Sequence, residues 1–389
     1  MNEMIIKGKV PFSPKEANYQ EERLEVLNKH FLEMVEKKEL VSGSYCLSRN
    51  NKVFADTGIG NLSFEEKDER VFAPDTIFRI ASITKLFTAI SILKLVEDGK
   101  LRVNQFVGEF IEEFNTPPYN TITIVHLLTH TSGLISDEGV HEDKYYQNWW
   151  KLVEDNNADK WMEAILKKGL QRMPGKEWSY STVGYMILGE IITRVSGMFC
   201  NDYIEKYIVE PCEMTDTCFG MKVEFAHRYN FRTPWMAGDI KKFMAGEEKS
   251  NGWELIPSTG GGLYSTSRDL IKFGNMIINN GCHNGKRIVG RKALEAMQRI
   301  HTSPEVKDYC WGAQGSYHAY GLGSEIFQAS NEEQFVTPGL LSHEGFGGCC
   351  IMIDVKEKFV AVWVPQFYEG QWYAHAFRNV ASIMWSGLE

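Results

Sequence analysis

The chain has 389 residues, 43% of them hydrophobic, which is enough for a large core in two domains or in one domain with an insertion. Its 51 acidic and 42 basic residues give a net charge of −9, which argues against nucleic acid or an anionic membrane as the main partner. The sequence contains no run of ~20 apolar residues that would span a bilayer and no secretory signal at its start. We therefore expect a cytoplasmic protein without a membrane partner.

The eight cysteines are scattered and form no Cys-x-x-Cys pair. We expect reduced thiols, most of them buried, with Cys349 and Cys350 on opposite faces of one strand. His126 and His130 lie four residues apart, but no Glu-x-x-His core accompanies them. We interpret both as structural histidines and expect no metal site.

The predicted elements begin with a surface helix in residues 16–38, followed by two strands around a turn at Asn50–Asn51. A long helix from about 82 to 97 ends at Asp98–Gly99. The middle of the chain is helical and loop-like. Its clearest helices lie in 161–170 and 183–197, and a long loop covers 225–256.

From residue 258 the pattern changes again. It predicts helices in 265–281, 292–300 and 372–386, and strand-like runs in 320–327, 340–354 and 359–366. Strands at both ends and helices between them indicate an α+β fold, with an antiparallel sheet built from N- and C-terminal strands and flanked by helices. We expect residues 1–100 and 258–389 to form the sheet domain and 101–257 a mainly helical inserted domain.

One helix carries a pair of polar residues inside an apolar run. In "FRIASITKLFTAI", Ser82 and Lys85 are three residues apart and so lie on one helix face. A buried lysine has a lowered pKa and can accept the proton of a serine, which is a poor nucleophile until its proton is removed. The helix N-terminus also favours a developing oxyanion. The pair predicts covalent acyl transfer, although Ser-x-x-Lys alone is also common as a surface pair or cap.

Two further elements follow in the order found in penicillin-recognising enzymes. Tyr180-Ser181-Thr182 stands about a hundred residues later, and His343-Glu344-Gly345 stands near the C-terminus. The chain resembles the serine β-lactamase and penicillin-binding-protein superfamily, and within it the class C β-lactamase-like branch with esterases, D-alanyl-D-alanine carboxypeptidases and D-aminopeptidases. The stretches that carry this resemblance are "FRIASITK", "ITIVHLLTHTSGL", "PGKEWSYSTVGYMILG", "STGGGLYSTSRDL" and "SHEGFGG".

The resemblance implies a β-lactamase/transpeptidase-like fold, a small-molecule acyl substrate and no cofactor or metal. Ser82 is similar to the acylated nucleophile of the family. Lys85 resembles the proton acceptor or the group that holds Tyr180 as a phenolate, and Tyr180 resembles the second proton relay. Which of the two is the general base stays open here. The backbone N–H groups of Ser82 and Phe346 would form the oxyanion hole.

The motifs also depart from the family pattern. The second motif ends in Thr182 where class C lactamases have asparagine, and the third has His343 and Glu344 where most lactamases have lysine and threonine. Neutral histidine supplies less positive charge than lysine, and Glu344 adds an anion. Together with Thr182 and Gly345, these residues would line a substrate-binding site poorly suited to a carboxylate. We therefore favour a carboxylesterase or small amidase.

The alternatives are a β-lactamase, a D-amino-acid peptidase or carboxypeptidase, and an acyltransferase that uses an alcohol or amine in place of water. From another class, a non-catalytic binding protein of the same fold is also considered. Nearby aromatic residues that could shape an acyl or aryl pocket are Tyr145, Tyr146, Trp149, Trp150, Trp235, Trp311 and Tyr317. The physiological substrate and the oligomeric state cannot be derived from the sequence.

Overall fold

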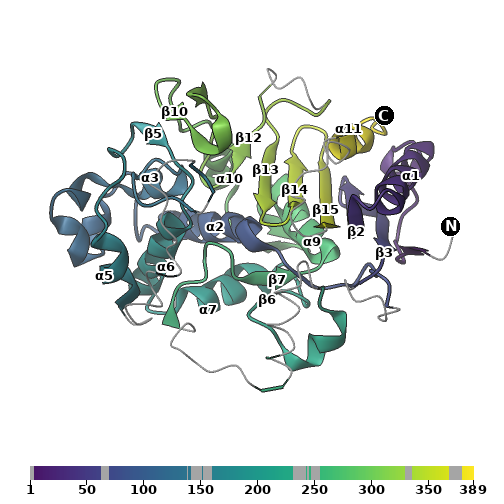
Figure 1. The fold of residues 1–389 in the computed structure, drawn as a ribbon, viewed down its shortest axis with the longest axis horizontal. Coiled ribbons are helices and arrows are strands. Elements are labelled where there is room, and N and C mark those ends of the chain that lie inside the picture. The colour runs from purple at the N-terminus through teal and green to yellow at the C-terminus, as the bar shows by residue number, and fades with distance from the viewer. Residues whose placement is uncertain are drawn as a thin grey trace.

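The centre of the computed structural model is a seven-stranded antiparallel sheet (Figure 1). The structure describes residues 4–62, 70–137, 139–141, 151, 160–230, 242, 245–246, 255–328, 335–367 and 379–389. The strands, in spatial order, are β1 (Ile5–Lys7), β3 (Lys52–Gly60), β2 (Leu40–Arg49), β15 (Phe359–Phe367), β14 (Cys349–Asp354), β13 (Leu341–Gly345) and β12 (Glu325–Ile326). The pairing of β2 with β15 joins the two ends of the chain, so the expected sheet of N- and C-terminal strands is confirmed.

Two helical layers cover this sheet. On one face, α1 (Glu22–Glu36) and α11 (Asn379–Trp385) pack together and enclose a core that includes Tyr45 and Cys350. On the other face, α9 (Ser267–Ile278) packs on β15 and β2, and its core includes Cys46 and Cys349. Neighbouring residues on each strand thus enter different cores, as the two-residue period of a strand requires. All eight cysteines are free, as expected.

The helix α2 (Thr84–Glu97) lies at the centre of the molecule (Figure 1). It is buried on nearly all sides because α6 (Thr182–Ser196) packs against it and Phe87 stacks on Phe273 of α9 with ring centroids 4.0 Å apart. A helix that is apolar all round needs such a position. The packing therefore places any polar group near the start of α2 in apolar surroundings.

Shorter elements surround this centre. The helices are α3 (Ile124–Leu128), α5 (Trp161–Leu166), α7 (Cys200–Ile204) and α10 (Arg291–Met297). The described residues also form three small sheets. The first contains β4 (Phe78–Arg79), β7 (Leu263–Ser265) and β6 (Cys218–Phe219). The second contains β5 (Glu177–Trp178), β10 (Lys307–Asp308) and β11 (Ser316–Tyr317), and the third β8 (Cys282–His283) and β9 (Lys286–Arg287).

The structure corrects some predicted elements. The expected strand in 320–327 is reduced to β12, because a turn in which Gly321 N–H donates to Ser324 O precedes it, and Gly323 there has φ of 90°. The run 340–354 is two strands, β13 and β14, joined by a tight turn. The last helix is described only from Asn379, and most of the loop at 225–256 lies outside the described residues.

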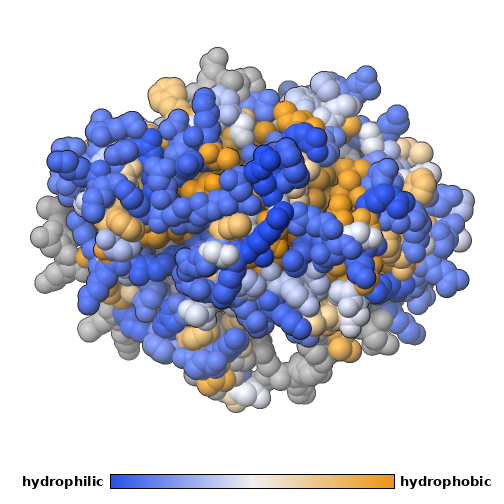
Figure 2. Space-filling view, turned by 180° about the vertical axis from the view of Figure 1, so that it is seen from behind, coloured by the Kyte–Doolittle hydropathy of each residue, from blue (hydrophilic) through white to orange (hydrophobic). Residues whose placement is uncertain are grey.

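The surface seen from behind the view of Figure 1 is mainly hydrophilic, with smaller hydrophobic areas between (Figure 2). Within the described part of the chain, no single helix has the length and apolar character needed to cross a bilayer. Among the described helices, one bent pair, α6 with the helical segment Cys200–Val209 at 79°, reaches that length and composition.

Candidate active site

Ser82 lies in a single 3-10 turn, Ala81–Ile83, that runs directly into α2. The preceding residue, Ala81, is held at φ of 47°, a left-handed conformation that is uncommon for residues other than glycine. Ser82 itself is only partly buried, whereas the α2 residues that follow are buried. The turn therefore keeps the serine hydroxyl at the accessible end of an otherwise enclosed helix.

The Lys85 side chain is fully buried and donates to three oxygens. Its Nζ lies 3.1 Å from Ser82 Oγ, 3.1 Å from Thr182 Oγ1 and 2.7 Å from the carbonyl oxygen of Gly260. The predicted Ser82–Lys85 proximity on one helix face is thus present in the structure. Burial in the apolar centre lowers the pKa of Lys85 from 10.5 to about 8, while the nearby Asp137 charge acts in the opposite direction.

Tyr180 reaches the same place from the segment between β5 and α6. Its ring centroid lies 4.8 Å from Lys85 Nζ. Burial and the Asp137 charge raise the pKa of Tyr180 well above 10, although a hydrogen bond with the Ser82 side chain acts to lower it. The phenol therefore stays protonated at neutral pH and has its hydroxyl beside Ser82.

The segment that carries Tyr180 is fixed by His130, which lies in the "THTSG" stretch. Its Nδ1 accepts the Ser181 backbone N–H at 3.1 Å, and its ring lies 4.4 Å from that of Tyr180. Burial and the nearby Lys85 lower its pKa well below 6.5, so the imidazole is neutral. The interpretation of His130 as a hydrogen-bonding histidine fits these contacts, and its ring also packs directly on the candidate site.

Asp137 is a site residue that the sequence analysis missed. Its Oδ1 accepts the backbone N–H of Thr182 at 2.7 Å and its Oδ2 accepts the Thr182 hydroxyl at 2.6 Å. Burial raises the pKa of Asp137, and the Lys85 charge acts to lower it. The one signal in the sequence was its place as the first carboxylate after the "HLLTHTSGL" stretch.

His343 lies on β13 and is almost fully buried. Its Nδ1 donates to the backbone carbonyl of Glu344 at 2.7 Å, so the neutral ring carries its hydrogen on Nδ1 and Nε2 accepts from the Tyr320 hydroxyl at 3.4 Å. Burial, with the Lys85 charge, lowers the pKa of His343 to about 4. The third motif therefore supplies no cation at neutral pH.

The next residues of the third motif lie beside the Ser82 turn. The Glu344 side chain is exposed, whereas a Cβ at Gly345 would overlap the carbonyl oxygen of Ile80 and lie 2.5 Å from Cys349 Sγ. The Cys349 thiol also lies 3.5 Å from that carbonyl. These contacts hold the turn with Phe346, whose side chain is exposed, next to the turn with Ser82.

Of the aromatic residues named from the sequence, two are described. Trp311 has φ of 49° and is 60% exposed, and its ring lies 5.5 Å from that of Tyr180, at the edge of the candidate site. Tyr317 is also exposed, but its hydroxyl donates to the Thr302 carbonyl. The others, Tyr145, Tyr146, Trp149, Trp150 and Trp235, lie outside the described residues.

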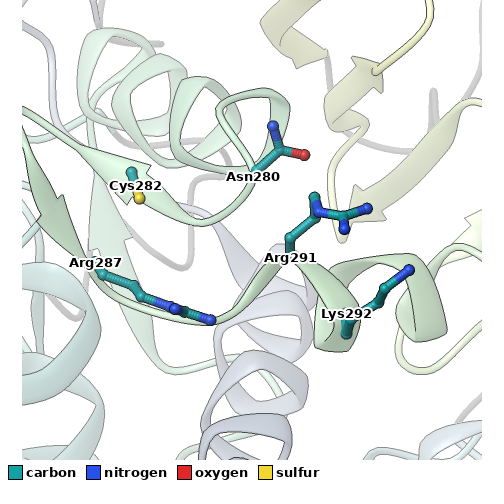
Figure 3. Close-up of a pocket in the computed structure, with 5 residues that line it drawn as sticks. All are labelled: Asn280, Cys282, Arg287, Arg291 and Lys292. Carbon is teal, nitrogen blue, oxygen red and sulfur yellow. The ribbon is translucent and has the colours of Figure 1, made fainter.

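A separate cavity of about 410 Å³ lies at the far end of α2 (Figure 3). Glu97, the last residue of α2, accepts from Gly290 N–H just before α10. The lining residues are Asn280, Cys282, Arg287, Arg291 and Lys292. Since 14 helical residues rise ~20 Å, this cavity is distinct from the surroundings of Ser82.

Comparison with known proteins gives an independent view of the chain. The family model described as Beta-lactamase matches residues 27–381. Among curated relatives, Protein flp of Staphylococcus aureus is 33% identical over 208 residues, 52% of this chain and 39% of that protein. The Putative penicillin-binding protein PbpX of Bacillus subtilis is 27% identical over 332 residues, 84% of this chain and 72% of that one. The chain thus matches only about two fifths of the length of the first of these relatives.

Two solved structures align over nearly all of this chain at a TM-score of 0.72 and 18% identity, covering 95% of it and 99% of each partner. One is a penicillin-binding protein homologue from Caulobacter crescentus and the other is a family VIII carboxylesterase. At this identity the two structures establish the fold alone.

Proposed function

Since the chain belongs to the β-lactamase family and is a serine hydrolase of that fold, we propose that it is a carboxylesterase or small amidase that acts through an acyl-enzyme on Ser82. The observation that carries this choice is the state of the third motif. His343 is buried and neutral, with a pKa lowered to about 4, and the exposed residue next to it is the acidic Glu344. Among the described residues, the third motif offers a substrate carboxylate no cation, and its acidic Glu344 would repel the carboxylate.

In the proposed acylation step, Lys85 is the general base. Its pKa is lowered to about 8, whereas that of Tyr180 is raised well above 10, so the neutral amine is far more accessible at neutral pH than the phenolate. Lys85 accepts the hydroxyl proton of Ser82 as Oγ forms a bond to the acyl carbon. The backbone N–H groups of Ser82 and Phe346 stabilise the resulting oxyanion.

Collapse of the tetrahedral intermediate breaks the bond to the leaving group. The Tyr180 hydroxyl, next to Ser82, gives its proton to the leaving oxygen or nitrogen and recovers one from the Lys85 ammonium, which lies 4.8 Å from its ring centroid. Water then attacks the acyl-enzyme, its proton follows the same route, and Ser82 is regenerated as the acid is released. Gly345, Thr182 and Glu344 are proposed as residues around the bound substrate.

The two solved structures with equal TM-scores, an esterase and a penicillin-binding protein homologue, share the fold and so leave both an ester and a penicillin-type substrate open. The neutral His343 and the acidic Glu344 favour the ester substrate. The test is a pair of p-nitrophenyl esters of equal length, the valerate and the monoester of glutarate, which differ in a terminal carboxylate. A chromogenic cephalosporin and a D-alanyl-p-nitroanilide complete the panel.

We expect kcat/KM for the neutral ester to exceed that for the anionic one by about tenfold or more, a difference that corresponds to about 1.4 kcal/mol. Glu344→Gln should narrow this ratio, whereas Glu36→Gln, a control on the exposed surface of α1, should leave it unchanged. Preference for the glutarate monoester or the cephalosporin would overturn the esterase proposal and favour the lactamase or peptidase alternative.

A further inference from the structure

Asp137 is tied to the second motif by three hydrogen bonds. Besides accepting the Thr182 N–H and hydroxyl at 2.7 and 2.6 Å, it donates its own backbone N–H to the Tyr180 carbonyl at 3.2 Å. Both carboxylate oxygens are therefore engaged by one residue, Thr182. This arrangement fixes where the single hydrogen of the Thr182 hydroxyl points.

The donors and acceptors around Lys85 can be counted from this arrangement. Gly260 O is a carbonyl and can only accept. Thr182 Oγ1 has given its hydrogen to Asp137, so it too can only accept from Lys85. A neutral lysine amine has two N–H bonds and one lone pair. Its two hydrogens are taken by Gly260 and Thr182, and the lone pair is left for the third neighbour, Ser82 Oγ at 3.1 Å.

We infer that Asp137 is a positioning residue: by holding the hydroxyl hydrogen of Thr182, it leaves the neutral Lys85 amine only one direction for its lone pair, toward Ser82. This inference rests on the proposed function, because it requires Lys85 to remove the Ser82 proton. Asp137 itself touches neither Ser82 nor the reacting atoms. Since Asp137 holds the hydroxyl hydrogen, Thr182 Oγ1 can only accept a hydrogen bond from Lys85. Thr182 therefore acts as the side-chain carbonyl of an asparagine would at this position.

The isosteric variant Asp137→Asn separates this role from a structural one. Thr182 N–H can only donate, so the amide oxygen must face it and the amide NH₂ must face Thr182 Oγ1. The Thr182 hydroxyl then has to turn its hydrogen toward Lys85. The lone pair of the neutral Lys85 amine then accepts a hydrogen bond from the Thr182 hydroxyl, and an N–H bond of the amine faces Ser82. The variant changes this orientation and retains the shape of the site.

The experiment measures kcat/KM for a neutral p-nitrophenyl ester against pH in the wild type and in Asp137→Asn, with Ser82→Ala in the same assay. We expect the high-pH plateau to fall about tenfold to a hundredfold in Asp137→Asn, within the range of general-base effects. We also expect the acid limb to move to lower pH, because the Asp137 charge that raises the pKa of Lys85 is gone. The limb shift reports the loss of the charge beside Lys85, and the fall of the plateau reports the loss of positioning, which the Thr182 variants separate from a structural defect.

Variants of Thr182 supply a second readout in case Asp137→Asn does not fold. Thr182→Val, which removes the acceptor, should lose at least about tenfold more activity than Thr182→Ser, which keeps one hydroxyl. In the double variant Asp137→Asn/Thr182→Val, the two losses should be clearly less than additive. An unchanged plateau in folded Asp137→Asn, or equal activity of the two Thr182 variants, overturns the inference. Turnover by Ser82→Ala would instead overturn the proposed function beneath it.

Discussion

The imidazole of His343 accepts a hydrogen bond from the hydroxyl of Tyr320, with Nε2 and the phenolic oxygen 3.4 Å apart and both side chains buried. This contact, with the bond from Nδ1 to the Glu344 carbonyl, uses both ring nitrogens in the neutral state. His343, which stands where most lactamases have a lysine, is thus part of the buried interior. Its neutrality has consequences for stability as well as for substrate choice.

The buried neutral His343 predicts acid sensitivity. Its pKa is about 4 in the folded protein and near 6.5 in the unfolded chain, so the unfolded chain binds more protons between these values. Above pH 6.5 the titration of His343 does not lower the free energy of unfolding. As the pH falls from 6.5 toward 4, protonation of the unfolded chain lowers this free energy by an amount on the order of 3 kcal/mol. Urea unfolding between pH 4 and 7 should therefore have a shallower pH dependence in His343→Gln than in the wild type.

His130 is also buried and neutral in both proteins, so the difference between them reports His343 together with its smaller charge interaction with His130. Identical pH dependence in the two proteins would mean that His343 is not desolvated as the structure has it.

The close approach of Gly345 to Ile80 predicts that a single methyl group will disturb the site. A Cβ there would overlap the Ile80 carbonyl and crowd Cys349 Sγ, so β13 or the Ser82 turn has to move. Gly345→Ala should lower the free energy of unfolding by about 1 to 3 kcal/mol and reduce ester turnover. Gly261→Ala is the matched control, because its Cβ would meet only ordinary contacts at 3.6 Å from Ala81. Equal stability of the two variants, measured by urea titration, would argue against this packing.

The exposed ring of Trp311 predicts a preference for flat or aromatic acyl groups. The ring lies 5.5 Å from Tyr180 and is 60% exposed, and the Trp311 backbone N–H is bonded to the Val140 carbonyl. Trp311→Ala should raise KM for a p-nitrophenyl benzoate about threefold to tenfold more than for the acetate. Tyr309→Ala, which removes a neighbouring exposed ring that covers Gly315, should change the two KM values equally. A uniform change in Trp311→Ala would exclude a contact with the acyl group.

The sequence was most informative where the chemistry is local. Ser82 and Lys85 are one helical turn apart, so their proximity follows from the helix alone. The sheet strands were recognisable as short strand-like runs bounded by turns, and the β2–β3 turn because Asn50 and Asn51 tolerate positive φ. The boundaries of the inserted helical domain at 101 and 257 stay a prediction, as does the cytosolic location.

Long-range relationships could not be predicted in this way. Asp137 precedes Thr182 by 45 residues, and only the folded segment brings its carboxylate to that hydroxyl. Similarly, the sequence placed Gly345 in the lining of the substrate-binding site but did not show that the space for a side chain there is taken by the Ile80 carbonyl of another element. The buried position of His343 likewise involves a contact with Tyr320, which is 23 residues away in the sequence. These features depend on packing, for which a single sequence has no periodic signal.

Every step of the proposed mechanism depends on acylation of Ser82. The most direct test is the intact mass of the wild type and of Ser82→Ala after incubation with a fluorophosphonate, with the modified peptide identified by sequencing. We expect one adduct per wild-type chain, attached to Ser82, and none on the folded Ser82→Ala variant. Equal labelling of both proteins, or an adduct on another residue with ester turnover retained in Ser82→Ala, would contradict it.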